Sequence, residues 1–282
     1  MRRIADRLFR LVTGLCAVGA LGLLTAIALT LLARGLPALG RGSVGSAVGG
    51  ALGSGGVLYP LLGTLLLVMT ALVVATPLAT ALALLETVYL RGALRRGLRT
   101  WLYVANAVPS ILFGIFGLLF FVLFLDWGKS WLAGGIVLGL MILPTVTVSL
   151  AERIAALPTR YRQAAAGLGL TRSQIIWSVL LPQSWGGLLS GALLGLARAA
   201  GETAPIMFTA VVFAGATLPD GVRDSPVLAL PYHIFVLAQD SFDPAAETQL
   251  WGAAVVLLAL VFGLSLVTLP IRLRLSEEAR HG

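Results

Sequence analysis

Long apolar runs, each long enough to cross a lipid bilayer, dominate the chain. Crossing the hydrocarbon layer as a helix takes about 20 apolar residues, and only helices or closed barrels satisfy the backbone there. Runs of this length recur and are separated by polar or glycine-rich links. We therefore predict an all-α, polytopic membrane protein with about six transmembrane helices, at approximately residues 11–33, 57–85, 102–125, 131–150, 185–213 and 250–271.

The composition agrees with a membrane protein. Of the 282 residues, 58% are hydrophobic and 11% are charged, and the mean hydropathy is +0.96. One soluble core could not bury this much apolar material. The net charge of +8 does not indicate nucleic-acid binding, because the basic residues are dispersed, without a basic stripe or an aromatic platform. Cys16 is the single cysteine, so we expect it to pack rather than to form an intrachain disulfide or a Cys-based metal site.

The first apolar run follows a basic segment and could be a secretory signal. It is longer than the apolar region of a signal peptide, and residues 36–40 make a poor cleavage site. We therefore predict that it is a retained first span.

Basic residues fall mainly on one side of the predicted spans. Lysine and arginine in short loops stay on the cytoplasmic side of a membrane. With the N-terminus inside, the inner segments carry most of the arginines, and the last outer loop, 214–249, is acidic. Both termini are therefore predicted to be cytoplasmic.

Proline residues interrupt or flank several predicted spans. Each proline removes a helical hydrogen bond, and the freed carbonyl needs a neighbour, water or a pathway. We expect kinked helices around a cavity, with irregularities at Pro60, Pro77, Pro109, Pro144 and Pro205.

Glycines four residues apart predict close helix packing in two spans. They are Gly135 and Gly139 in the fourth span and Gly187, Gly191 and Gly195 in the fifth. The pattern leaves open whether the facing helix belongs to this chain or to a second subunit.

An amphipathic segment, 151–182, joins the fourth and fifth spans on the cytoplasmic side. Gly169 can end one short helix in the left-handed conformation, and Thr171 with Gln174 forms a pattern that caps the start of a second. Apolar residues at 175, 176, 179 and 180 give the second helix one apolar stripe, and we expect Pro182 to end it. A helical pair lying on the membrane surface would fit the same pattern.

The fifth predicted span carries two opposite charges. A charge at bilayer depth costs at least about 2.5 kcal/mol on insertion scales, so it persists where it faces a partner, a cavity or water. Arg198 and Glu202 are four residues apart and can pair on one helix face. The charges alone are also compatible with an ion pair that only orients the helices.

The cytoplasmic loop resembles the signature of importers of the ATP-binding-cassette (ABC) class. That signature reads Glu-Ala-Ala, three residues, Gly, nine residues, Ile, one residue, Leu-Pro. Every spacing is matched here by Gln163, Ala164, Ala165, Gly169, Val179 and Pro182. The resemblance implies a coupling helix that docks on a separate ATPase subunit. Gln163 lacks the carboxylate that a charge-dependent contact with the ATPase would use, and Val179 replaces isoleucine conservatively.

The run 198–205 is similar to the PstA-type permease subunits of phosphate-specific ABC importers. Segments 108–114 and 143–148 agree with the same family, and the resemblance covers about 57–271. It implies a type I ABC importer permease fold, with Arg198, Glu202 and Thr203 on the substrate pathway. An arginine offers a planar fork of donors to phosphate oxygens, and the nearby Glu202 would keep it from holding the anion too tightly for conduction.

This resemblance implies a permease that carries inorganic phosphate into the cytoplasm by alternating access in a prokaryotic inner membrane. Its implied partners are a second, homologous permease, two copies of an ATPase subunit and an extracytoplasmic phosphate-binding protein. The chain itself is expected to be no enzyme and to hold no cofactor or metal, because ATP and Mg belong to the ATPase. The expected organisation is an N-terminal helix with an outer linker, 1–56, a permease domain, 57–271, and a cytoplasmic tail, 272–282.

Other functions stay open at this point. A permease for sulfate or molybdate would share the coupling loop, and an ion-gradient-driven transporter would need no ATPase. An intramembrane enzyme would need a nucleophile with a base, or metal ligands, which Arg198 and Glu202 cannot supply. The tripeptide 128–130 ends like a phosphate-binding loop, but Leu123 stands where that loop requires glycine.

Isolated polar residues are weaker candidates. Thr64, Thr70 and Asn106 could line the route, although such residues more often form hydrogen bonds between helices. His233 lies in an aromatic segment of the last outer loop, which suggests an interfacial helix that meets a substrate-delivering protein. A lone histidine argues against a metal site.

Overall fold

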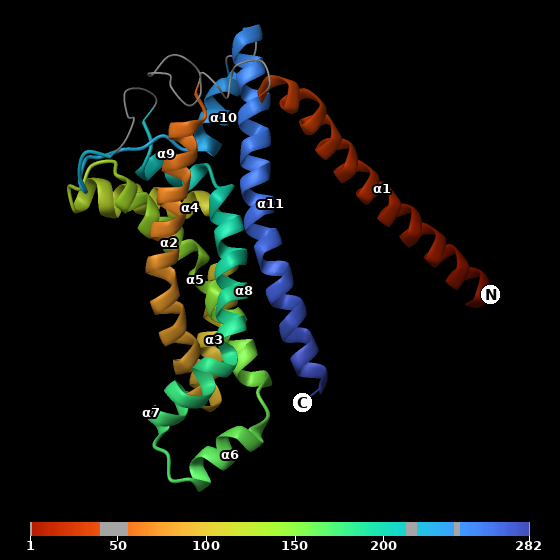
Figure 1. Cartoon of the computed structure of the whole chain (residues 1–282), viewed down its shortest axis with the longest axis vertical. Helices are drawn as coiled ribbons and strands as arrows, with labels where there is room; N and C mark the ends of the chain where they lie inside the picture. The colour runs from red at the N-terminus through yellow and green to blue at the C-terminus, as the bar shows by residue number, and fades with distance from the viewer. Residues whose placement is uncertain (1, 40–55, 213–218, 240–242, 282) are drawn as a thin grey trace. The chain divides into compact units, whose positions relative to one another are not determined.

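The computed structural model describes residues 2–39, 56–212, 219–239 and 243–281, with side chains from residue 8 to residue 266 within these ranges. The chain divides into two compact units, Met1–Val57 with Leu237–Val256, and Leu58–Val236 with Leu257–Gly282 (Figure 1). The predicted outer linker lies outside the described residues except for its last residue, Gly56. The second unit holds every predicted site residue.

The described regular structure is helical, as predicted, apart from one isolated bridge between Val211 and Val227. Five described helices are long and apolar enough to cross a membrane, or six if one bent pair is a single span, which agrees with the predicted number. In chain order the elements are α1 (Arg2–Ala38), α2 (Leu58–Leu84), η2 (Leu85–Tyr89), α3 (Gly92–Ala107), α4 (Ser110–Gly117), η3 (Leu118–Phe124), α5 (Trp131–Ala156), α6 (Thr159–Gly167), α7 (Arg172–Ile175), η4 (Ile176–Leu180), α8 (Leu181–Ala200), α9 (Ala204–Thr209), α10 (Leu230–Gln239) and α11 (Pro244–His281), where η marks π-helical turns.

The predicted third span is not one straight helix. After α3 the chain turns at Val108 and Pro109, and α4 with η3 continues at 91° to α3. Proline disfavours the helical conformation at the residue before it. Val108 is accordingly extended, with φ −63° and ψ 129°. The kink expected at Pro109 is confirmed, and it is sharp enough to send the chain sideways.

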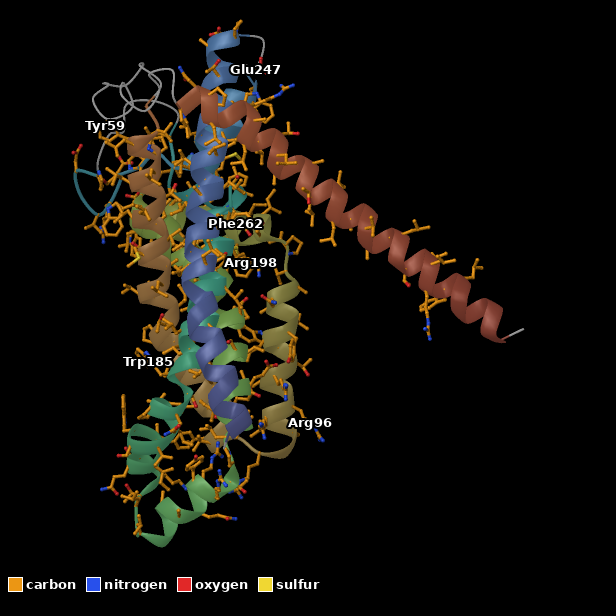
Figure 2. The ribbon with its side chains drawn as sticks, turned by 45° about the vertical axis from the view of Figure 1, so that its right-hand side comes forward. Tyr59, Arg96, Trp185, Arg198, Glu247 and Phe262 are labelled. Carbon is orange, nitrogen blue, oxygen red and sulfur yellow. The ribbon has the colours of Figure 1, made fainter. Side chains whose placement is uncertain are left out.

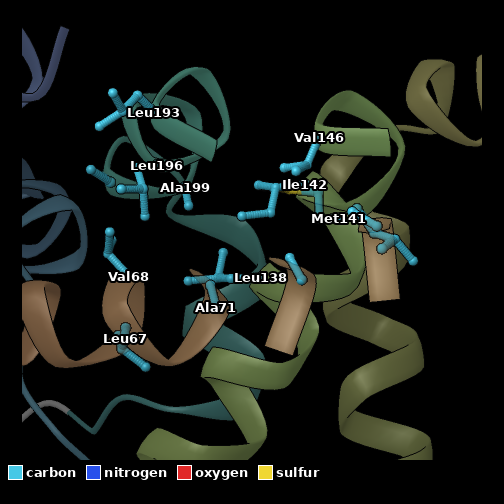
Figure 3. Close-up of a cluster of buried hydrophobic side chains, with 14 of the residues drawn as sticks. Leu67, Val68, Ala71, Leu138, Met141, Ile142, Val146, Leu193, Leu196 and Ala199 are labelled. Carbon is cyan, nitrogen blue, oxygen red and sulfur yellow. The ribbon is translucent and has the colours of Figure 1, made fainter. Parts of the chain in front are cut away.

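Helix α5 is the centre of the second unit. Of its most apolar stretch, 67% is buried, against 28% for that of α2. Side chains such as Leu138 and Ile142 of α5 pack with Leu67 of α2 and Leu196 of α8 in one buried cluster (Figure 3). This packing holds the C-terminal half of α8 against α5.

The glycines of α8 face α5 of the same chain. A Cβ added to Gly187 would lie 2.4 Å from the Cβ of Arg153, and one added to Gly191 would lie 2.8 Å from the Cβ of Ser149. The hydroxyl of Ser149 also donates to the carbonyl of Gly187, at 3.0 Å. The close packing that the spacing predicted is therefore packing within this chain.

Gly187→Ala is expected to lower the midpoint of thermal unfolding of the purified importer in detergent. The new methyl group would overlap the side chain of Arg153, and overpacking of this kind costs about 1–3 kcal/mol. Gly97→Ala is the matched control, because Gly97 lies in α3 with nothing within 4 Å of the added Cβ. There the higher helix propensity of alanine should leave stability unchanged or slightly raised. Equal midpoints for the two variants would contradict the tight α5–α8 contact.

Pro182 does not end the second loop helix, so that prediction is wrong. α7, η4 and α8 continue without a break from Arg172 to Ala200. In the π-helical turn the N–H of Leu181 donates to the carbonyl of Ile176, five residues back. Pro182 then falls in the first turn of α8, where a missing N–H is tolerated. One continuous helix therefore leads from the loop between the fourth and fifth spans into the fifth span.

Candidate functional site

Arg198 and Glu202 lie where the fifth span breaks. Helix α8 gives way to α9 at residues 201–203. The Nε of Arg198, in the last turn of α8, is 3.7 Å from the Oε1 of Glu202, so the two charges form the expected i, i+4 pair. Thr203 directly precedes α9, and its carbonyl accepts a hydrogen bond from the N–H of Met207. The three predicted pathway residues are thus neighbours.

The break itself follows from Pro205. Proline has no N–H to donate to the carbonyl of Gly201, four residues earlier, and the helical bonding pattern stops there. The N–H groups of Gly201 and Glu202 instead bond carbonyls three residues back, those of Arg198 and Ala199. The arginine and the carboxylate are therefore accompanied by irregular, polar backbone.

Two residues from other helices complete this cluster. The Oδ1 of Asn106, in the last turn of α3, accepts a hydrogen bond from the Nη1 of Arg198 at 2.9 Å and another from the hydroxyl of Thr145, in α5, at 2.9 Å. Asn106 had been a weak sequence candidate, and Thr145 had not been singled out. We call Asn106, Thr145, Arg198 and Glu202 the polar cluster.

Two helix breaks meet beside the polar cluster. A Cβ added to Gly114 of α4 would lie 2.9 Å from the Cα of Pro205 and 3.0 Å from the carbonyl oxygen of Ala204, so α4 and α9 nearly touch through their backbones. Figure 2 shows Arg198 at mid-length of the second unit, with Tyr59 toward one end and Trp185 and Arg96 toward the other. Arg198, in the last turn of α8, therefore lies between the two ends of the second unit.

The polar cluster is partly open. The side chains of Arg198 and Glu202 are 33% and 19% exposed, and Asn106 is exposed. The bend between α3 and α4 also borders an open apolar pocket of about 420 Å³, against α5. Its lining includes Val108, Phe116 and Pro144 and none of the polar cluster. An apolar pocket thus lies beside the kink at Pro109 and against Pro144, and the polar groups lie outside it.

The loop between the fourth and fifth spans has the local structure that its sequence predicts. Gly169 has φ +76°, the left-handed conformation expected after α6. Thr171 and Gln174 form a reciprocal capping box at the start of α7. Ile176 and Leu180 are buried, and they belong to the predicted apolar stripe. In Figure 1, α6 and α7 lie side by side beyond the ends of α5 and α8.

The signature residues of the loop divide between its outer surface and its packed face. Gln163, Ala164, Gly169 and Pro182 are exposed, Ala165 is buried and Val179 is half-buried. Large apolar side chains are exposed on the same loop, with Leu168 at 82% and Trp177 at 71%. An exposed apolar helical surface of this kind is typical of a contact with another protein or with lipid.

The other polar candidates have structural roles. Lys129 donates to the carbonyls of Met207 and Val211, at 3.1 and 3.3 Å, around the end of α9, and Ser130 caps the start of α5. Thr64 accepts from the N–H of Leu230 at 2.8 Å, and Thr70 donates to a carbonyl of its own helix. These bonds agree with helix contacts rather than with a route for substrate.

His233 lies in the helix α10, between spans. Burial lowers the pKa of its imidazole, which favours the neutral form. Within the described ranges no group of three or more histidine, cysteine, aspartate or glutamate side chains is placed to hold a metal ion.

Comparison with known proteins identifies the family. The model of the family described as "Binding-protein-dependent transport system inner membrane component" matches residues 75–273. The chain belongs to this family. It is 30% identical over 283 residues to a "Probable phosphate transport system permease protein PstA" of Methanocaldococcus jannaschii, a match that covers 99% of this chain and 97% of that protein.

Other similarities of this permease agree. It is 32% identical over 213 residues to the "Phosphate transport system permease protein PstA 2" of Mycobacterium tuberculosis, covering 76% of this chain and 69% of that protein. Among solved structures, an inward-facing MetNI methionine ABC transporter has a TM-score of 0.57 at 18% identity, covering 78% of this chain and 94% of that one. The last similarity shows the ABC importer permease fold. As an inner-membrane component of this family, the chain is a translocation subunit.

Proposed function

We propose that this permease carries inorganic phosphate into the cytoplasm as one subunit of an ATP-driven importer. The observation that carries the proposal is the polar cluster, in which an arginine lies at a helix break midway along the membrane-spanning unit. The names of its PstA relatives favour phosphate over sulfate or molybdate.

Arg198 suits a tetrahedral oxyanion because much of its guanidinium is uncommitted. A guanidinium has five N–H donors. Nε faces Glu202 and one donor of Nη1 is used by Asn106. The remaining donors can bind two oxygens of one phosphate, as arginine does in bidentate pairs. Glu202 weakens this hold, which conduction requires.

Transport would couple to ATP through the cytoplasmic loop. We propose that α6 and α7 dock on an ATPase subunit and that both termini lie in the cytoplasm. The continuous helix from Arg172 to Ala200 carries Arg198 near its far end, so a displacement of α7 moves the polar cluster. This connection supports alternating access, in which ATP binding shifts the population between two arrangements of the helices.

The proposed assembly contains a second, homologous permease, two ATPase subunits with their ATP and Mg, and an external phosphate-binding protein. The organisation proposed for this chain is 1–56, 57–271 and 272–282, and in the structure the last segment continues α11 as far as His281.

Reconstitution in vesicles tests the function. Vesicles with both permeases, the ATPase and the loaded binding protein are expected to accumulate phosphate with ATP, and vesicles without the ATPase are expected to accumulate none. Excess sulfate or molybdate should not reduce the uptake. Uptake driven by an ion gradient without ATP, or sulfate competing as well as phosphate does, would contradict the proposal.

A further inference from the structure

Asn106 occupies an unusual position in the polar cluster. It lies in the last turn of α3, immediately before the break at Val108 and Pro109, and its side chain bonds residues of two other helices. It therefore connects the broken third span to the arginine of the fifth.

The orientation of the Asn106 amide follows from its partners. Arg198 can only donate hydrogen bonds, so the atom that faces it must be the amide oxygen. The hydroxyl of Thr145 donates to the same oxygen. Both bonds use Oδ1, and no described residue accepts a hydrogen bond from Nδ2. Two N–H donors of an exposed amide thus lie beside the open donors of Arg198.

The free N–H groups of Arg198 and the two N–H groups of Asn106 can together bind an anion that has several oxygens. We propose that Asn106 is a second substrate-binding residue, whose Nδ2 donates to an oxygen of the tetrahedral oxyanion that Arg198 holds. This inference rests on the proposed function. The neutral amide adds specificity for oxygen acceptors without adding charge, so the anion can still leave. Thr145 has a positioning role, because its hydroxyl fixes which way the amide points.

Three variants in the full importer separate the donors of Asn106 from its acceptor. Asn106→Leu removes both, and Asn106→Gln keeps both. Asn106→Asp keeps an acceptor for Arg198 and Thr145, has no donors and adds a negative charge that also repels the anion. The leucine and aspartate variants lose the proposed hydrogen bond from Asn106 to the charged phosphate. This loss is expected to reduce phosphate uptake about tenfold. Glutamine is expected to retain more than half of the uptake. Assembly of the importer, measured as co-purification of its subunits, should be unchanged in all three.

Thr145→Val tests whether disturbing the amide oxygen of Asn106 is by itself enough to reduce phosphate uptake. It removes one bond to Oδ1 and leaves both donors, so a reduction in uptake smaller than threefold is expected. The inference is overturned if Asn106→Leu or Asn106→Asp transports at the normal rate, or if Thr145→Val reduces uptake as strongly as Asn106→Leu. If the unmodified importer moves no phosphate, the proposed function fails, whereas normal uptake by these variants refutes only the role of Asn106.

Discussion

Arg198→Ala is expected to remove most phosphate uptake while the importer still assembles. Hydrogen bonds to charged groups contribute about 1.5–3 kcal/mol, which corresponds to a roughly ten- to hundredfold loss of rate. The variant also leaves Glu202 without its partner, and an unpaired carboxylate repels the incoming anion. Because the side chain of Arg198 is 33% exposed and lies outside the buried cluster, little packing is lost. Phosphate uptake by vesicles that contain the full importer measures the change.

Two further variants test the reason for that loss. Arg198→Lys keeps the charge without the planar fork, so intermediate uptake is expected. Arg96→Ala removes an exposed arginine from the other end of α3 and should leave uptake unchanged. ATP hydrolysis should persist in Arg198→Ala, because the loop between the fourth and fifth spans is intact. Normal uptake by a fully assembled Arg198→Ala importer would refute the assigned role.

Local features of this chain could be predicted because they depend on neighbouring residues. Gly169 takes the left-handed conformation, and Thr171 with Gln174 forms the capping box, since each depends only on residues within one turn. The approximate spans follow from hydropathy for the same reason. Pro109 was expected to kink its span, but the 91° bend depends on how α4 packs against α9, which no local pattern contains.

The effect of Pro182 was mispredicted because a π-helical turn can accommodate a proline. Four of the five preceding residues, 176–180, are apolar and resemble an ordinary helical stripe. Nothing in their spacing indicates that the N–H of Leu181 bonds five residues back instead of four.

The sequence indicates the two charged residues of the polar cluster more clearly than its two uncharged ones. Arg198 and Glu202 stand out because they are charged residues in an apolar run. Thr145 and Thr147 are both threonines of one apolar helix, yet Thr147 bonds its own helix at Leu143 whereas Thr145 bonds Asn106. The difference arises from which face of α5 meets α3, and this requires the folded structure.

Gly169→Ala is expected to weaken the proposed contact between the loop and the ATPase. Gly169 has φ +76°, and nothing lies within 4 Å of the added Cβ, so the effect is purely conformational. The left-handed conformation costs a residue with a Cβ about 1–2 kcal/mol, enough to depopulate the native turn roughly five- to thirtyfold where the loop has an alternative. The bond from Leu170 N–H to the carbonyl of Ala165 would be lost, and α6 and α7 would change direction relative to each other. Phosphate uptake and stimulated ATP hydrolysis should therefore fall together, by about fivefold or more.

Gly167→Ala makes the same chemical change two residues earlier and is the matched control. Gly167 is the last residue of α6, and its Cβ would also meet nothing within 4 Å. Alanine favours the helix there by up to about 1 kcal/mol, so coupling should be normal. Loss of activity in both variants would indicate that any Cβ on this surface blocks the ATPase, and normal activity in both would show that the left-handed turn is not needed. Only a loss confined to Gly169→Ala supports a loop that works by holding two helices at a fixed angle.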